Sequence, residues 1–205
     1  MTRAEASTAL GWYAAFAFAL VGLLGYFVSS RTPTRVDLEA TALRGAATQY
    51  AALLTALGYW PTLTFLSVVA VLGLVAEPGS AFLSVGLVAS HTLSQIVVVA
   101  VKPLFRRARP DNWLVRQEDG TSYPSGHSST AITFYFALLL IVWRLEIPVL
   151  ARIVFAAALV CCVAGIPWSR LALGAHYLTD VAGGTIFGTA WLAASIALLL
   201  RFGPP

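Results

Sequence analysis

The sequence predicts an all-α membrane protein, a polytopic bundle of six transmembrane helices whose polar residues gather at one membrane face. Of the 205 residues, 59% are hydrophobic and only 11% are charged. Soluble domains carry about a quarter charged residues, so this composition argues against a water-soluble fold. The charges also fall in clumps that leave six uncharged stretches, each close to the length that crosses a bilayer.

Proline, glycine and charged residues bound the six expected spans, which cover 8–28, 54–76, 81–101, 127–143, 147–167 and 177–200. We expect each span to be a helix, because a helix satisfies its own backbone hydrogen bonds in lipid, and the alternating pattern of a membrane β-barrel is absent. The first stretch is long enough to be a retained span rather than a signal peptide. Pro61, near the start of the second span, makes that span the hardest to place.

The spans leave room for one unit, a single membrane-embedded domain over residues 1–205, with tight connections expected at 77–80 and 144–146. The formal net charge is +4, but no basic run interleaved with aromatic residues supports nucleic-acid binding. We therefore expect no nucleic-acid partner, and anionic headgroups or phosphates instead. Cys161 and Cys162 are adjacent in an apolar stretch, which is typical of small core residues.

With six spans, the segments 29–50, 102–126 and 168–175 emerge on one face. That face collects nine of the 13 basic residues, namely Arg31, Arg35, Arg44, Lys102, Arg106, Arg107, Arg109, Arg116 and Arg170. The positive-inside rule would place it in the cytoplasm. Residues that bind a substrate do not report topology, however, so this count determines the orientation only weakly.

The first polar cluster runs from Lys102 to Arg109-Pro110. Lys102 is the only lysine in the chain, and Arg109 follows it by seven residues. If the helix continues, seven residues make two turns and place both side chains on one helix face. Pro110 would then end the helix. The alternative is a basic cluster that snorkels to the membrane edge.

The second cluster is Tyr123-Pro124-Ser125-Gly126-His127, directly before the fourth span. Small residues that open a helix expose backbone N–H groups at the positive end of the helix dipole, an arrangement that binds phosphate. Ser125 adds a hydroxyl group, and His127 can exchange a proton near neutral pH. The alternative is an ordinary turn and N-cap with a surface histidine.

The third cluster runs from Ser169-Arg170 to His176 and Asp180, at the start of the last span. On a helix, residues four apart are neighbours, so the Asp180 carboxylate would hold one N–H of the His176 ring and leave the other nitrogen free as a base or nucleophile. A lone carboxylate is costly at this depth, which favours a function. A purely structural His–Asp pair is the alternative.

Taken together, the three clusters lie on the same predicted face, and all three structural alternatives would have to hold independently. In order and spacing, Lys102 to Arg109-Pro110, then Pro124 to His127, then Ser169-Arg170 with His176 and Asp180 resemble the K-x6-RP, PSGH and SR-x5-H-x3-D signature of the type-2 phosphatidic-acid phosphatase superfamily. The resemblance covers residues 102–180, and no signature position departs from the pattern.

The resemblance implies a mechanism. His176 would attack phosphorus to form a phosphohistidine, Asp180 would orient and stabilise its imidazolium, and His127 would protonate the leaving oxygen and later activate water. The non-bridging oxygens would be held by Lys102, Arg109, Ser125, the Gly126 backbone N–H and Arg170. The sequence offers no set of acidic and histidine metal ligands, and the resemblance likewise implies metal independence, with no cofactor.

Several polar residues lie outside the signature. His91 and Gln95 could form a polar stripe below the site, but a hydrogen-bonded interhelical pair is favoured. Gly184 and Gly188 form a GxxxG pattern that suits either a homodimer face or close packing within the bundle. Two further residues, Arg106 and Arg107, are expected to contact lipid headgroups, and Asp37 could position a basic residue or be solvated.

The expected function is removal of the terminal phosphate from a lipid phosphate or diphosphate. A polyprenyl diphosphate such as undecaprenyl diphosphate is favoured because inserted domains are lacking. Phosphatidic acid, phosphatidylglycerol phosphate, transfer of the phosphoryl group to another lipid, and anion transport without catalysis are the alternatives. We expect a multi-pass protein of the plasma (inner) membrane with the site facing outward.

Overall fold

The computed structural model describes residues 1–29, 32–75, 80–111, 114 and 119–203. In this part of the chain the secondary structure is entirely helical, which confirms the all-α prediction. The elements are α1 (Arg3–Val28), α2 (Arg35–Glu39), η1 (Ala40–Leu43), α3 (Thr48–Ala56), α4 (Trp60–Val75), α5 (Ser80–Phe105), α6 (Gly126–Thr130), η2 (Ala131–Phe136), α7 (Ala137–Val142), α8 (Val149–Ala172) and α9 (Leu178–Phe202).

The structure does not establish the predicted count of six transmembrane helices. Within the described residues, four helices are long and apolar enough to cross a membrane: α1, the 82–105 part of α5, α8 and α9. The pair α3 and α4 makes a fifth span if it counts as one, although it is bent by 56°. The predicted fourth span corresponds to α6, η2 and α7, a shorter apolar helix over 126–142.

The expectation of one continuous helix over 54–76 is wrong. The helix begins earlier, at Thr48, breaks after Ala56, and restarts at Trp60. Gly58 lies in the break, and Pro61 lies in the first turn of α4, where its missing N–H has no intrahelical partner to lose. A hydropathy pattern does not register this bend, because the residues on both sides are apolar.

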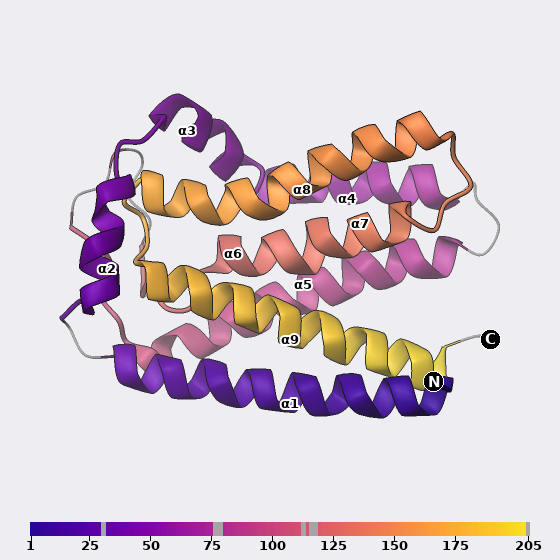
Figure 1. Ribbon diagram of the computed structural model, residues 1–205, viewed down its shortest axis with the longest axis horizontal. Helices are drawn as coiled ribbons and strands as arrows, with labels where there is room; N and C mark the ends of the chain where they lie inside the picture. The colour runs from indigo at the N-terminus through magenta and orange to yellow at the C-terminus, as the bar shows by residue number, and fades with distance from the viewer. Residues whose placement is uncertain (30–31, 76–79, 112–113, 115–118, 204–205) are drawn as a thin grey trace.

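The helices pack with α1 along α9, α3 against the end of α8, and α4 against α5 (Figure 1). The chain segment from α6 to α7 is enclosed by its neighbours α5, α8 and α9. Many large apolar side chains on the outer helices are exposed, among them Trp12, Phe16, Phe65, Leu72 and Leu150. Such a surface suits hydrocarbon rather than water, as expected for a membrane protein.

The glycine pair Gly184 and Gly188 lies where α9 meets the α6–η2 segment. A Cβ atom at Gly184 would lie 2.2 Å from the backbone oxygen of Ser125, and one at Gly188 would lie 2.8 Å from Cβ of Ile132. Both glycines therefore serve close packing within this chain, the second of the two predicted alternatives.

The polar segments meet at one end of the bundle. Figure 1 shows α2 across the end where α1 and α8 finish and α9 begins, with both chain termini at the opposite end. Backbone hydrogen bonds tie this end together, from Gly45 N–H to Ala172 O at 2.9 Å and from Leu114 N–H to Leu173 O at 3.2 Å. Residues 77–79 of the predicted turn, and Arg31 and Arg116 of the basic face, lie outside the described residues.

Candidate active site

Lys102 and Arg109 do not share a helix face, which corrects the prediction. Helix α5 has Pro103 in its last turn and ends at Phe105, and Arg106 follows with φ of 49°. The two side chains nevertheless reach one segment, because Lys102 Nζ donates to Thr121 O at 3.0 Å and Arg109 Nε donates to Gly120 O at 3.2 Å. The loop thus brings together the two cations that a continuous helix was expected to align.

His176 lies in the connection between α8 and α9, with only 4% of its surface exposed. The carbonyl oxygen of Arg170 accepts the backbone N–H groups of Ala175 at 2.9 Å and of His176 at 3.3 Å. This turn closes α8 and fixes the backbone of His176 directly beneath the end of the helix.

Both ring nitrogens of His176 have polar neighbours. Arg109 Nη1 lies 3.1 Å from Nε2, and Ser122 Oγ lies 3.2 Å from Nδ1. A guanidinium group has donors and no acceptor, so Nε2 must present its lone pair to Arg109. The hydrogen-bond network therefore assigns the proton to Nδ1. This is the tautomer that leaves Nε2 ready to act as a nucleophile.

Asp180 is fully buried, and its contact with the His176 ring runs through the hydroxyl group of Ser122. Ser122 Oγ donates to Oδ2 at 2.5 Å, while His176 Nδ1 is 3.4 Å from the same oxygen. His176 precedes α9 and is not on the helix, so the predicted helical spacing is not the cause of this proximity. Asp180 lies in the first turn of α9, where its Oδ2 also accepts the Tyr177 backbone N–H at 2.9 Å.

Arg107 contradicts the expectation that it contacts lipid headgroups. Only 2% of its surface is exposed, and its guanidinium bridges two carboxylates, Asp180 Oδ1 at 2.7 Å and Asp37 Oδ2 at 2.6 Å. Arg107 Nη1 also donates to Thr179 Oγ1 at 2.5 Å. The arginine therefore links the first loop to the carboxylate beside His176.

Asp37 is a buried partner of a basic residue, Arg107, which is the first of its two predicted alternatives. Its Oδ1 accepts the Thr179 backbone N–H at 2.9 Å, and its Oδ2 accepts the Thr34 N–H at 3.0 Å. Burial alone would raise the pKa of Asp37, but the hydrogen bonds from Thr179 and Thr34 outweigh burial and leave the pKa below its ordinary value. Asp37 is thus held ionised beside Arg107.

Ser125 caps the helix that starts with Gly126. Its Oγ accepts the Ser128 N–H at 3.4 Å and the Ser128 hydroxyl at 3.1 Å, and its own N–H donates to Asp180 O at 3.0 Å. The turn before α6 is therefore docked on the first turn of α9. This contact places the predicted phosphate-binding turn beside the helix that carries Asp180.

His127 packs into the break between α3 and α4. Its ring meets Tyr59 edge-on, with ring centroids 4.8 Å apart. A Cβ atom at Gly58 would lie 2.3 Å from His127 Cδ2, so the absence of a side chain at Gly58 makes room for the ring. The bend between the two helices accordingly holds His127 in place.

Arg170 is buried in the last turn of α8, where a cation is favourable to the helix dipole. Its Nη1 donates to Thr55 Oγ1 of α3 at 2.5 Å. Of the predicted residues, His176, Asp180 and Arg109 meet around one imidazole, directly or through Ser122. Arg170 is connected to this group because its carbonyl oxygen accepts the His176 N–H, and Ser125 because its N–H donates to Asp180 O. Lys102 is connected through its hydrogen bond to Thr121 O, next to Ser122.

A groove between α4 and α5, with a volume of about 770 Å³, runs beside His127 and Gly126. Its lining is mostly apolar, and His91 and Gln95 also contribute to it. His91 Nδ1 lies 3.0 Å from Thr133 Oγ1, which confirms the predicted hydrogen bond between helices for His91, whereas Gln95 Nε2 donates to Ser94 Oγ of the same helix at 3.4 Å. The groove therefore adjoins His127 on its apolar side.

The sequence does not predict the roles of Ser122 and Arg107, and it leaves the role of Asp37 open between two alternatives. Thr34 and Asp37 form a capping box at the start of α2, a pattern visible in the sequence as Thr-x-x-Asp. That pattern indicates a helix start but not a pairing with Thr179, and nothing in the sequence singles out Ser122. Among the described residues, no group of three or more His, Cys, Asp or Glu side chains is placed to hold a metal ion.

The chain belongs to the PAP2 superfamily, whose family model matches residues 83–203. This match covers more than half of the chain and confirms the resemblance drawn from the motifs.

Curated relatives match the same region. A lipid A 1-phosphatase of Rhizobium etli is 33% identical over 89 residues, covering 40% of this chain and 34% of that protein. Phosphatidylglycerophosphatase B of Bacillus subtilis is 33% identical over 92 residues, covering 43% of this chain and 44% of that protein. The chain therefore aligns with less than half the length of these relatives.

A solved structure extends the similarity to nearly the whole fold. The crystal structure of a transmembrane PAP2-type phosphatidylglycerolphosphate phosphatase from Bacillus subtilis matches with a TM-score of 0.71 and 20% sequence identity. The match covers 93% of this chain and 94% of that one. At this identity the comparison shows that the fold is shared.

Proposed function

We propose that this protein is a metal-independent membrane phosphatase that hydrolyses the terminal phosphate of a lipid phosphate or diphosphate through a phosphohistidine intermediate. The observation that carries the proposal is the pair of polar contacts at the His176 ring, from which its tautomer is inferred. Its Nε2 lone pair faces Arg109 Nη1 at 3.1 Å, while its Nδ1–H faces Ser122 and Asp180. A substrate phosphate that displaces this contact would leave Nε2 free to attack phosphorus and the Arg109 guanidinium free to bind the phosphate oxygens.

The proposed reaction has two steps. In the first, the Nε2 lone pair of His176 forms a bond to phosphorus, and the bond from phosphorus to the lipid oxygen breaks as His127 supplies a proton to that oxygen. In the second, His127 takes a proton from water, whose oxygen attacks phosphorus and releases His176 and orthophosphate. Asp180, through Ser122, stabilises the positive charge on the ring during both steps.

The remaining predicted residues would hold the phosphate oxygens. Guanidinium and ammonium groups neutralise the charge that collects on the non-bridging oxygens during transfer. We propose this role for Lys102, Arg109, Arg170, Ser125 and the backbone N–H of Gly126.

A lipid substrate is supported by the groove between α4 and α5, which reaches His127 from the apolar side. The relatives are named for lipid A 1-phosphate and phosphatidylglycerophosphate, both phosphate monoesters of lipids. Our favoured substrate remains a polyprenyl diphosphate, because the described segments between helices carry no inserted domain. Phosphatidic acid and phosphatidylglycerol phosphate are the comparison substrates.

The first experiment is phosphate release by the purified protein in detergent with EDTA. A polyprenyl diphosphate, phosphatidic acid, phosphatidylglycerol phosphate and lipid A 1-phosphate would be compared, with His176→Ala alongside. We expect release that persists in EDTA and is lost in the variant. We also expect a phosphoenzyme that accumulates in His127→Ala. No release from any lipid, or equal release by His176→Ala, would remove the hydrolase proposal and favour transfer to a lipid acceptor or anion transport.

We also propose six membrane crossings, with the bent pair α3–α4 and the segment 126–142 as two of them. At 1.5 Å per residue a helix of 17 residues is about 25 Å long, close to the hydrocarbon thickness.

We place the protein in the plasma (inner) membrane with the site outward. An impermeant thiol reagent added to intact cells should then label Leu38→Cys and spare Ala4→Cys. The reverse pattern would invert the orientation. A mass measurement of the purified protein in detergent would test the homodimer hypothesis.

A further inference from the structure

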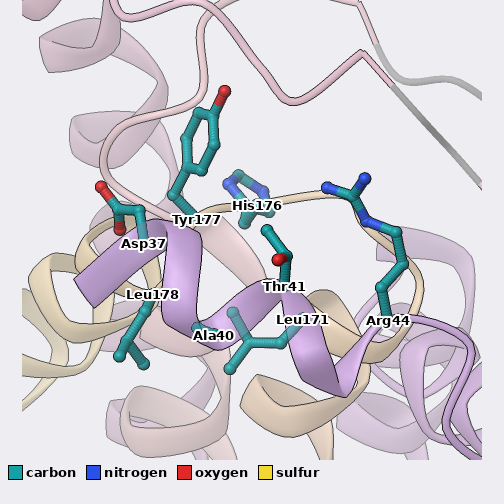
Figure 2. A pocket seen from close by; sticks show the side chains of 8 residues that line it. All are labelled: Asp37, Ala40, Thr41, Arg44, Leu171, His176, Tyr177 and Leu178. Carbon is teal, nitrogen blue, oxygen red and sulfur yellow. The ribbon is translucent and has the colours of Figure 1, made fainter. Parts of the chain in front are cut away.

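A small pocket lies beside His176, on the side of the α2–η1 segment. It is lined by Thr41 and Arg44 from the first loop and by His176 and Tyr177 from the α8–α9 connection, among others. Figure 2 shows the Arg44 guanidinium on the same side of the η1 ribbon as the His176 ring, with Thr41 between them. Arg44, a cation from outside the signature, thus lines the same pocket as the candidate nucleophile His176.

The side chain of Arg44 is half-buried and makes no hydrogen bond or ion pair with the part of the chain that the structure describes. Its Nε is buried and has no hydrogen-bond partner there. Two other arginines of the same end have anionic partners, since Arg107 binds Asp37 and Asp180, and Arg35 binds Glu39 at 2.9 Å. A half-buried guanidinium without an anion is costly, so the position of Arg44 calls for an anionic partner.

The backbone around Arg44 is fixed rather than loose. The Arg44 N–H donates to Thr41 O at 3.0 Å, and the next residue, Gly45, donates its N–H to Ala172 O at 2.9 Å. Gly45 has φ of 83°, in the left-handed region that glycine adopts without strain. This turn anchors Arg44 to the last turn of α8, directly before the connection that carries His176.

We propose that Arg44 is a further phosphate-binding residue, which holds oxygens of the phosphate group placed at His176. A guanidinium group has the fork of donors that matches phosphate oxygens, and the bond is stronger when both partners are charged. The ligand is a tetrahedral phosphate anion, either the terminal group of the lipid substrate or the released orthophosphate. This inference rests on the proposed function, which brings that anion to His176.

The test compares Arg44→Gln and Arg44→Lys with Arg35→Gln, a control cation in the same segment whose side chain is 92% exposed. Binding of orthovanadate, a tetrahedral phosphate analogue, and of orthophosphate would be measured by calorimetry on the purified proteins. A hydrogen bond to a charged group is worth a factor of about 10 to 150 in affinity. We expect a Kd at least about 10-fold weaker in Arg44→Gln, partial recovery in Arg44→Lys, and no change in Arg35→Gln.

Kinetics on the lipid substrate identify the source of the anion. If Arg44 binds the lipid phosphate, Arg44→Gln raises KM or lowers kcat. If it binds only the released orthophosphate, the variant weakens inhibition by orthophosphate and leaves KM and kcat unchanged. Because the Arg44 side chain has no described hydrogen-bond partner, we expect an unchanged Tm for Arg44→Gln.

Unaltered binding of vanadate and phosphate in Arg44→Gln would overturn the inference, as would a wild-type protein that binds neither anion. A wild-type protein that binds vanadate through Arg44 but cleaves no lipid would leave the anion site in place and refute the proposed function instead. The calorimetric readout therefore separates the two failures.

Discussion

A single guanidinium, that of Arg107, is shared between the buried carboxylates of Asp37 and Asp180. Taking three charges out of water is costly, and the cost is offset only when every oxygen and N–H finds a partner. Here the remaining carboxylate oxygens are satisfied by backbone and hydroxyl donors, including Thr179 and Ser122. Removing one member would leave an uncompensated charge beside the candidate catalytic carboxylate.

We predict that Asp37→Asn destabilises the protein by about 3 kcal/mol or more at neutral pH, the usual cost of breaking a buried ion pair. The pKa of Asp37 is lowered by its hydrogen bonds, so its carboxylate stabilises the fold above the ordinary carboxyl range. That stabilisation is lost as the pH falls through the lowered pKa, below about pH 4. Thermal unfolding in detergent should show a Tm difference between the wild type and Asp37→Asn that narrows as the pH is lowered.

The control for this prediction is Glu39→Gln, which breaks the exposed pair with Arg35 in the same short helix. Exposed pairs contribute about 1 kcal/mol or less, so we expect little change in Tm. A loss of stability in Asp37→Asn no larger than that of Glu39→Gln would show that the buried network does not stabilise the fold.

Ser122 joins the His176 ring to Asp180, and its removal tests the relay. Ser122→Ala removes the hydroxyl that lies 3.2 Å from Nδ1 and 2.5 Å from Oδ2. We expect a kcat lower by about 10-fold or more, with KM little changed, because the hydrogen bond to a charged group supports the ring in the transition state. Thr121→Ala is the matched control, since the described contact of Thr121 with Lys102 uses its backbone oxygen. Equal kcat values for the two variants would contradict the relay.

Individual residues of the site differ in how far the sequence predicts them. The motif residues from Lys102 to Asp180 are predicted because type and spacing repeat a known signature. Asp37 is invisible to such a pattern, since it pairs with Thr179 across 142 residues. Only the tertiary fold brings α2 to the start of α9, so neither that contact nor the pairing of Arg107 follows from local sequence.

At the scale of elements, the sequence predicts the helices well and their interruptions poorly. Apolar stretches between charges identify α1, α8 and α9 within a few residues of their ends. The bend between α3 and α4 and the end of α5 at Phe105 were not predicted. The break after Ala56 contains Gly58, and α5 ends just before Arg106, whose φ is 49°; a hydropathy pattern registers neither feature. The lengths of spans are therefore predictable, whereas the direction of the side chains beyond such a break is not.

The bend between α3 and α4 leads to a prediction about His127. Gly58→Ala would place a Cβ atom 2.3 Å from His127 Cδ2, so the ring or the bend must shift. A displacement of about 1 Å in a catalytic group costs on the order of 10²-fold in rate. We expect a comparable loss of kcat for phosphate release in Gly58→Ala. Gly73→Ala in α4 is the control, because a Cβ atom there meets nothing within 4 Å. Full activity in Gly58→Ala would refute the idea that the bend positions His127.

At the scale of the whole molecule, the polar pocket beside His176 and the apolar groove beside His127 are lined by different residues. The α2–η1 segment covers the polar end near His176, whereas the groove lies between α4 and α5 and is lined mostly by apolar residues. A bilayer lipid presents the same division, because its phosphate lies at the interface and its chain in the hydrocarbon. Under the proposed function, the polar end would bind the phosphate and the groove beside His127 would bind the chain.

This division predicts that filling the groove affects long-chain substrates selectively. Thr92 lines the groove and is exposed to it, whereas its neighbour Leu93 is 52% exposed and does not line the groove. We expect Thr92→Trp to raise the KM for a long-chain lipid phosphate several-fold, because the indole displaces apolar contacts worth about 0.8 kcal/mol per buried CH₂ group. Leu93→Trp, which adds the same side chain one position away, should behave as the wild type. A short-chain, water-soluble phosphate ester should be cleaved equally by all three proteins, since it does not need the groove. If Thr92→Trp slowed both substrates alike, the groove would support the catalytic residues rather than hold the chain, and the lipid would have to reach His127 by another route.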